Sequence, residues 1–114
     1  EVCPAGALTP DGAAADCRRC LSALTIENHD DALPAAAAAA LGGRVAGCDE
    51  CQLCCPHNAG AVPTAVADFT PWPAVMTLTR DRITAMSQTE FDTAFAGSAL
   101  RRVTLATLRR NALG

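Results

Sequence analysis

Cysteine is the residue type whose number and spacing in this sequence point most directly to chemistry. The chain has 114 residues and seven cysteines, and residues 48–56 read C-D-E-C-Q-L-C-C-P. Thiolates at such close spacing usually meet at a metal centre. The pattern therefore predicts a metal site, and it leaves open which metal and which thiolates. The seven are Cys3, Cys17, Cys20, Cys48, Cys51, Cys54 and Cys55.

A zinc ion with four thiolates is one interpretation of this pattern. The two Cys-x-x-Cys pairs, residues 17–20 and 48–51, have the form of zinc ligand pairs, although the gap between them is longer than usual. This interpretation leaves the other three cysteines without a role. Disulfides are a second alternative, but two such pairs and two adjacent cysteines suit metal ligation better. Metal-bound thiolates indicate a reducing, cytoplasmic setting.

An iron–sulfur cluster accounts for more of the cysteines. In the bacterial two-cluster pattern C-x2-C-x2-C-x3-C-P, the cysteine before proline binds the other cluster. Cys3 and Cys55 both precede proline, so each resembles that last position. Cys3 would then end a motif whose first three cysteines lie upstream. Since the chain also begins at Glu-Val-Cys rather than at methionine, we expect it to be a piece of a longer protein.

The remaining ligand of the cluster at Cys48 and Cys51 has two candidates. One set is Cys3, Cys48 and Cys51 with Cys54, and the other replaces Cys54 by Cys20. Spacing alone favours Cys54, because it follows Cys51 after two intervening residues. The residues by themselves leave both sets open.

Four stretches of the sequence resemble the epoxyqueuosine reductase family. Residues 19–27 read R-C-L-S-A-L-T-I-E and residues 47–56 read G-C-D-E-C-Q-L-C-C-P, where the family has R-C-I-S-Y-L-T-I-E and G-C-D-D-C-Q-x-V-C-P-W-N. Residues 95–102 and 108–114 also resemble the end of this region. The resemblance spans nearly the whole chain and identifies it as a C-terminal fragment covering part of the ferredoxin-like domain.

The resemblance implies an enzyme that reduces epoxyqueuosine to queuosine in tRNA with cobalamin and two 4Fe-4S clusters. The fragment alone is expected to be inactive, because the cobalamin domain and the proton donor would lie upstream. Expected partners are tRNA, cobalamin and an external electron donor, with no membrane, and the protein is expected to be a monomer. A ferredoxin-like electron-transfer module without an RNA partner is the alternative, and a zinc-binding structural module is the weaker one.

The resemblance also implies roles for individual residues. One complete cluster would be held by Cys3, Cys20, Cys48 and Cys51, and Cys55 would be the single local ligand of the other. Cobalamin contacts would come from Ser22, Thr25 and Asp49. Cys17 and Cys54 depart from the family pattern and are expected to be spare, packed thiols. His57 is expected to be a packing substitution for a tryptophan, and His29 a surface residue.

The basic residues are concentrated at the C-terminal end. The net charge is −3, yet residues 101–114 hold four of the nine basic residues and none of the twelve acids. Arginine binds phosphate through a planar fork, so these side chains are candidates for tRNA phosphate contacts. A solvated helix end is the plainer alternative on charge alone. The candidates are Arg101, Arg102, Arg109 and Arg110.

Short helices and loops are expected to position these residues, with no convincing strand. The apolar half of the composition is rich in alanine and holds only three Phe and one Trp, so the core is thin. We expect a mainly α fold with a ferredoxin-like iron–sulfur segment at 1–62 and a linker loop with C-terminal helices at 63–114. Helices are predicted at 17–27, 34–41, 49–54, 78–86, 87–96 and 104–113. Residues 57–76 are predicted to be an extended loop that Phe69 and Trp72 pin to the body.

Overall fold

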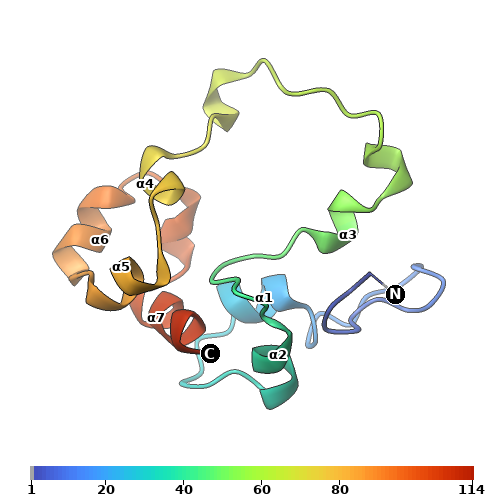
Figure 1. The fold of residues 1–114 in the computed structure, drawn as a ribbon, viewed down its shortest axis with the longest axis horizontal. Helices are drawn as coiled ribbons and strands as arrows, with labels where there is room; N and C mark the ends of the chain where they lie inside the picture. The colour runs from blue at the N-terminus through green and yellow to red at the C-terminus, as the bar shows by residue number, and fades with distance from the viewer. Residues whose placement is uncertain (1) are drawn as a thin grey trace.

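The computed structural model of the protein describes residues 2–114 and consists of short helices joined by loops (Figure 1). No named β-strand occurs in this part of the chain, and Leu8 and Ala15 form an isolated antiparallel bridge. The prediction of a mainly α fold is confirmed. The helices are α1 (Leu21–Ile26), α2 (Ala35–Ala40), α3 (Glu50–Leu53), η1 (Pro56–Asn58), η2 (Ala67–Phe69), α4 (Pro73–Met76), α5 (Arg80–Ala85), α6 (Gln88–Ala94), η3 (Ala99–Arg102) and α7 (Leu105–Leu113).

Helix α1 begins later than predicted. Residues 17–20 form a turn, and Cys20 occupies the position before the helix. Asp16 directly precedes the predicted helix at 17–27, but it accepts hydrogen bonds from the backbone N–H and the guanidinium of Arg18. The hydrogen bond from the Arg18 side chain lowers the pKa of the Asp16 carboxyl. The local Asp–Arg contact therefore competes successfully with helix capping.

The C-terminal helices follow the capping signals of the sequence closely. The Ser87 hydroxyl accepts a hydrogen bond from Glu90 N–H, and the Glu90 carboxylate accepts one from Ser87 N–H, so the two residues form a capping box at the start of α6. Thr79 and Thr104 cap α5 and α7 in the same way, through hydroxyl oxygens that accept backbone N–H groups. The predicted helix at 78–86 is therefore shorter by its first two residues and its last one.

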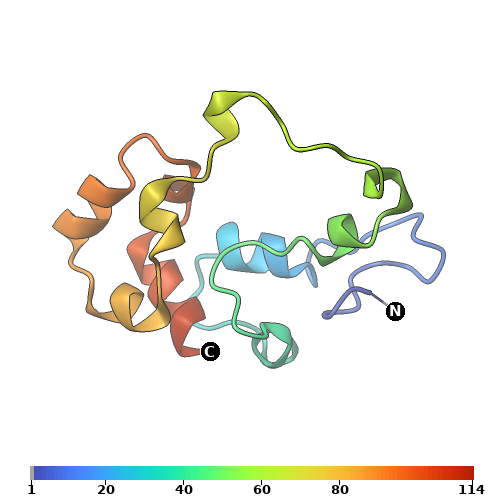
Figure 2. The ribbon, with the colours of Figure 1, turned by 45° about the horizontal axis from the view of Figure 1, so that its top comes forward.

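Two apolar clusters hold the chain together. The C-terminal core contains Phe91 and Phe95, whose ring centroids are 5.3 Å apart, and it includes side chains from α5, α6 and α7. The N-terminal core consists of Leu21 and Leu24 from α1, Ala37 from α2, and Leu41, which directly follows α2. Figures 1 and 2 show α5, α6 and α7 at one end of the molecule, and α3 with the N-terminal loop at the other.

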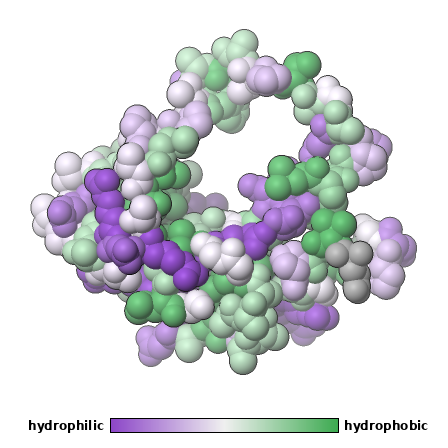
Figure 3. Space-filling model, viewed as in Figure 1, coloured by the Kyte–Doolittle hydropathy of each residue, from purple (hydrophilic) through white to green (hydrophobic). Residues whose placement is uncertain are grey.

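Residues 57–72 bow outward as an arch (Figures 2 and 3), and α4 returns to the body, where Ala74 packs against the C-terminal core. The prediction that Phe69 pins this segment is wrong, since its side chain is 72% exposed. Trp72 does attach the arch, because its indole N–H donates to the carbonyl of Ala94 at 2.9 Å. The radius of gyration of 15.3 Å exceeds the roughly 13 Å of a compact domain of this length, as such an arch requires.

None of the helices in residues 2–114 combines the length and the apolar character that a membrane crossing requires.

Candidate iron–sulfur site

All seven cysteines are free thiols, and they differ in burial. Cys3, Cys20, Cys48 and Cys55 are half-buried, and these are four of the five predicted ligands. The fifth, Cys51, is exposed. Cys17 and Cys54 are exposed as well, so the expectation that they are packed is wrong. Seven thiols without a disulfide keep the full set of donors that iron or zinc takes from cysteine.

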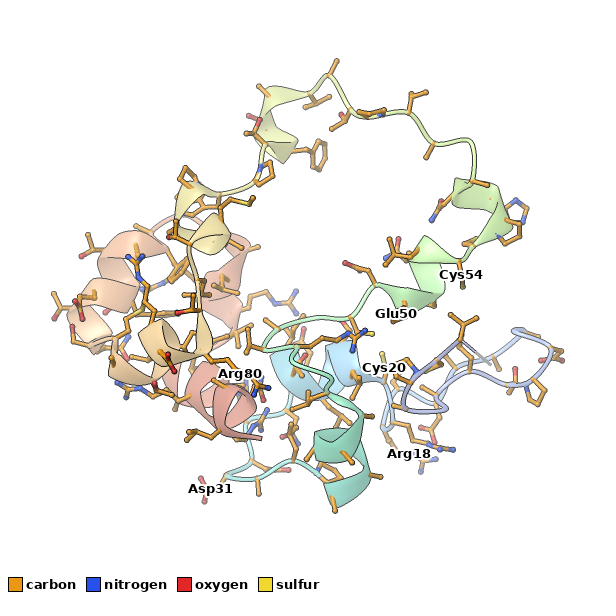
Figure 4. All side chains as sticks on the ribbon, viewed as in Figure 1. Arg18, Cys20, Asp31, Glu50, Cys54 and Arg80 are labelled. Atoms are coloured by element: carbon orange, nitrogen blue, oxygen red, sulfur yellow. The ribbon has the colours of Figure 1, made fainter. Side chains whose placement is uncertain are left out.

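The N-terminal core brings three of the predicted ligand segments together. Cys48 itself packs against this core, and so does Ala5, two residues after Cys3. Leu21, which belongs to the core, directly follows Cys20. Cys3, Cys20 and Cys48 are far apart in the sequence, and the fold gathers their segments around one small apolar cluster. Figure 4 shows Cys20 at the start of α1, on the same side of the molecule as α3.

The thiol of Cys3 lies in a turn of backbone N–H groups. The N–H of Ala7 donates to Cys3 Sγ at 3.2 Å, and the N–H of Gly6 donates to the carbonyl of Cys3 at 3.0 Å. Burial raises the pKa of the Cys3 thiol, but backbone hydrogen bonds from Ala7, Ala5 and their neighbours outweigh burial and lower it. The turn therefore favours a thiolate at Cys3, which is the form that binds iron.

Cys48 is fixed by contacts on both sides. Gly47, which precedes it, has φ +78°, a conformation that glycine adopts without strain, and its N–H donates to the Thr25 hydroxyl at 3.0 Å. After Cys48, Glu50 forms an ion pair with Arg44, which also donates to the carbonyl of Leu41 at 3.0 Å. These contacts tie the Cys48 segment to α1 and to the end of α2.

Helix α3 and the turn after it carry the other clustered cysteines. Cys54 Sγ lies 3.5 Å from the carbonyl oxygen of Cys51, so its thiol donates within the helix. Cys55 precedes Pro56, the first residue of η1. The amide of Asn58 donates to the carbonyl of Gln52 at 3.0 Å and holds η1 against α3.

The described part of the chain has no group of three or more His, Cys, Asp or Glu side chains placed to share one metal ion. A zinc ion takes its sulfurs at about 2.3 Å from a single centre. In a 4Fe-4S cluster the four cysteines surround a larger body of iron and sulfide. A cluster therefore requires that its ligand segments lie near one another, not that the sulfurs meet at one point. The segments of Cys3, Cys20 and Cys48 meet this requirement.

The three predicted cobalamin contacts differ in their surroundings. Asp49 is exposed and its carboxylate does not cap α3, and Ser22 is half-buried on α1. Thr25 is fully buried, and its hydroxyl donates to the carbonyl of Leu21 at 2.7 Å while accepting the N–H of Gly47. The Thr25 hydroxyl is therefore used within the chain, and cobalamin contact by these residues stays a prediction.

The four arginines of the C-terminal end fall into two pairs. Arg101 and Arg102 lie in η3 and are exposed, and each forms an ion pair, with Asp92 and Glu27 respectively. Arg101 also lies over the ring of Phe91, 5.8 Å from its centroid. Contact between these two guanidiniums and tRNA phosphate stays a prediction.

Arg109 and Arg110 lie in α7, are half-buried and contact the chain's own carbonyl groups. Arg109 donates to the carbonyl of Met86. Arg110 donates to the carbonyls of Leu24, Asn28 and Asp30 at 2.8–3.0 Å. Burial lowers the pKa of the Arg110 guanidinium, an effect that the Asp30 carboxylate opposes.

The two histidines are both exposed. His57 therefore does not fill a packed position, and the expectation of a packing substitution is wrong. His29 lies at the surface as expected, although its Nδ1 is 3.1 Å from the hydroxyl of Thr107 in α7.

Two contributors to the site were not predicted. Asn111 is fully buried in α7 and contacts the segments of Thr25 and Val45, and Arg44 braces the Cys48 segment. The position of Asn111, three residues after Leu108 in the apolar stripe of α7, was a signal of a buried amide that sequence reasoning missed.

Comparison with known proteins gives one family match. The family model described as a 4Fe-4S double cluster binding domain matches residues 1–58. The matched residues contain all seven cysteines, as well as α1, α2 and α3.

Curated relatives match nearly the whole chain. Epoxyqueuosine reductase of Gloeobacter violaceus is 44% identical over 116 residues, which are 98% of this chain and 36% of that protein. The protein of the same name from Escherichia coli is 37% identical over 102 residues, 90% of this chain and 26% of that protein. The chain thus spans about a third of the length of the curated relatives that it matches.

Solved structures match over the same extent. The epoxyqueuosine reductase of Bacillus subtilis superimposes with a TM-score of 0.84 and 29% identity, covering 98% of this chain and 29% of that protein. A crystal structure of epoxyqueuosine reductase with an epoxyqueuosine-modified tRNA-Tyr stem loop matches with the same TM-score, identity and coverage.

Proposed function

Because the chain belongs to the family of 4Fe-4S double cluster binding domains, we propose that it carries electrons through two such clusters. Residues 1–62 would form the cluster-binding unit. Residues 63–114 would form the linker loop and the C-terminal helices. The family match to residues 1–58, which include every cysteine, supports this division.

The proposed ligands of the complete cluster are Cys3, Cys20, Cys48 and Cys51. Three of these lie in segments that meet at the N-terminal core, and Cys3 has a backbone N–H directed at its sulfur. Cys55 is the proposed local ligand of the second cluster. When bound, a 4Fe-4S cluster takes up and releases single electrons. The chain's own residues hold the thiolates, and the N–H of Ala7 donates a hydrogen bond to Cys3 Sγ.

For the complete protein we propose the reduction of epoxyqueuosine to queuosine in tRNA, with cobalamin as second cofactor. The observation that carries this proposal is the 44% identity to an epoxyqueuosine reductase across 98% of the chain. The tRNA stem loop in a crystal structure of a similar protein supports tRNA as the partner. An external electron donor, a cytoplasmic location and a monomeric state belong to the same proposal.

Contact with cobalamin is proposed for Ser22 and Asp49, whose polar side chains are not fully buried. Thr25 was predicted with them, and its buried hydroxyl would act through the backbone of Gly47. Bound cobalamin would supply the bond-forming chemistry, and the protein would orient it. A cobalamin electron paramagnetic resonance (EPR) spectrum that stays unchanged in both Ser22→Ala and Asp49→Asn would contradict the two direct contacts.

The reaction itself is tested with the complete gene product that carries this chain. The protein is purified without oxygen and incubated with cobalamin, a low-potential reductant and tRNA that contains epoxyqueuosine. Mass spectrometry of the digested tRNA is expected to show a loss of one oxygen, corresponding to queuosine. The control is the same reaction without reductant. A protein that holds both clusters but leaves the tRNA unchanged would instead favour an electron-transfer module without an RNA substrate.

A further inference from the structure

The side-chain amide of Asn111 in α7 joins two segments that lead to proposed cluster ligands. Its Nδ2 donates to the carbonyl of Thr25 at 2.9 Å and to the carbonyl of Val45 at 2.7 Å. Its Oδ1 accepts from Arg110 at 2.8 and 3.1 Å. The side chain is fully buried, so the loss of these bonds leaves polar groups of the protein unpaired.

Residues Arg110 and Asn111 of α7 donate hydrogen bonds to the carbonyls at the C-terminal end of α1. The last carbonyls of a helix lack partners within the helix, and α1 has only six residues. Arg110 donates to the carbonyl of Leu24 and Asn111 to that of Thr25. A cationic guanidinium also suits the negative end of a helix dipole. Helix α7 therefore supplies hydrogen-bond partners for the last carbonyls of α1.

The same amide holds the segment that leads to Cys48. Asn111 fixes the carbonyl of Val45, and the Thr25 hydroxyl fixes the N–H of Gly47. Residues 45–47 are thus bound at both ends, once by α7 and once by α1. Cys48 follows directly, and the Arg44–Glu50 ion pair restrains it from the other side.

Helix α1 connects Thr25 to Cys20, the other proposed ligand. Cys20 precedes the first residue of α1, and Thr25 lies five residues later, about 7.5 Å along a helix axis. Because Thr25 holds Gly47 and Asn111 holds Thr25, the separation of Cys20 and Cys48 depends on hydrogen bonds through two buried side chains. No ligand belongs to α7, yet α7 helps to set the distance between two of them.

We propose that Asn111 and Thr25 are positioning residues that set the geometry, and hence the reduction potential, of the cluster held by Cys20 and Cys48. This inference rests on the proposed function, because it needs a cluster at these thiolates. Residues that orient metal ligands without touching the metal are known to tune it, and hydrogen bonding and exposure set cluster potentials.

The test uses the complete gene product, reconstituted without oxygen, and two substitutions that keep the branching of the side chain but remove its hydrogen-bonding groups. Asn111→Leu removes the amide, and Thr25→Val removes the hydroxyl that holds Gly47. Both variants are expected to shift the midpoint potential and the EPR signal of the same cluster, and to leave the other cluster unchanged. Thr25→Ser keeps a hydroxyl and is expected to restore the signal of the unsubstituted protein.

The matched control is Thr107→Val in the same helix. Thr107 is also buried, and its hydroxyl contacts His29 and Thr104 rather than the Cys48 segment. This variant is expected to lower stability without moving either potential. The comparison separates a positioning role from a general loss of packing in α7.

The outcomes distinguish this inference from the function on which it rests. Unshifted potentials in folded Asn111→Leu and Thr25→Val variants overturn the positioning role while leaving the clusters in place. A shift in Thr107→Val equal to that in Asn111→Leu overturns it as well. If Asn111→Leu does not fold, the comparison of Thr25→Val with Thr25→Ser decides. An unsubstituted protein without any 4Fe-4S signal overturns the proposed function itself.

Discussion

Cys20 and Cys54 are the two thiols between which the choice of cluster ligand lies. Spacing along the sequence favours Cys54, whereas resemblance to the reductase family favours Cys20. In the fold, Cys20 is half-buried beside Leu21 of the N-terminal core, and Cys54 is exposed and donates to a carbonyl of its own helix. The position of Cys20 next to the apolar core that Cys48 also contacts supports Cys20, because the ligands of one cluster must lie near one another.

Separate serine substitutions test this choice. Cys20→Ser is expected to cost one of the two clusters, about half of the bound iron and sulfide, since the complete cluster would keep three of its four thiolates. Cys54→Ser is expected to retain the iron and sulfide of the unsubstituted protein. The measurement is iron and acid-labile sulfide per chain, together with visible absorption, after anaerobic reconstitution of the complete gene product. Loss of a cluster in Cys54→Ser but not in Cys20→Ser would refute the family-based ligand set.

At the scale of elements, η3 and α7 present their arginines to different environments. The ion pairs of Arg101 and Arg102 are exposed, and exposed pairs contribute only about 0–1 kcal/mol, so a phosphate can replace the carboxylate at little cost. Arg110 is half-buried and satisfies carbonyls at the end of α1. Moving Arg110 to a phosphate would leave these carbonyls without a partner.

The arginine pairs are therefore expected to respond differently to substitution. Arg101→Gln and Arg102→Gln should weaken tRNA binding and reduce the slope of log affinity against log salt by about 1 each, because each removes one phosphate contact. Arg110→Gln should instead lower the free energy of unfolding by about 1–3 kcal/mol. Fluorescence anisotropy over a range of salt concentrations and urea unfolding measure the two effects.

Arg18→Gln is the matched control for the tRNA measurement. Arg18 is highly exposed and pairs with Asp16, but it lies in the N-terminal loop outside the predicted contact surface. Its substitution is expected to leave the salt slope unchanged. If the slopes of Arg101→Gln and Arg102→Gln equal that of Arg18→Gln, the proposed phosphate contacts of η3 are wrong.

At the scale of the whole molecule, the arch is the segment with the least support. Side chains from 56 to 73 are all exposed, and the indole of Trp72 provides the attachment to Ala94. The body is held together elsewhere, by α7 against α1 and by the bonds of Asn111 and Arg110. Cutting the arch should therefore not separate the two halves.

Brief digestion of the chain with chymotrypsin tests this organisation. Among the aromatic sites, Phe69 is exposed, Phe91 and Phe95 are buried, and Trp72 precedes proline, which blocks cleavage. Cleavage after Phe69 is expected to be the first aromatic cut, identified by mass spectrometry. The two fragments should elute together in size-exclusion chromatography. In the Phe69→Ala control this cut should disappear, and separate elution of the fragments would contradict the joining role of α7.

The sequence by itself determined the local features of this protein. The capping box at Ser87 and Glu90, the stop of α2 before two glycines, and the cysteine-proline motifs all depend on neighbours within a few residues. Such signals act through short-range hydrogen bonds and backbone sterics, so they survive in almost any tertiary context. The mainly α fold and the family resemblance follow from them.

Only the tertiary structure decided which distant segments meet. The Thr25 hydroxyl binds Gly47 rather than a cofactor, and the Arg110 guanidinium binds the end of α1 rather than solvent. The side chain of Phe69 stays exposed rather than pinning the arch to the body. Each of these outcomes depends on packing between segments that are far apart in the chain. Asn111 shows the reason most clearly. A buried amide is satisfied only where two carbonyls, here of Thr25 and Val45, converge on it, and no local pattern specifies that convergence.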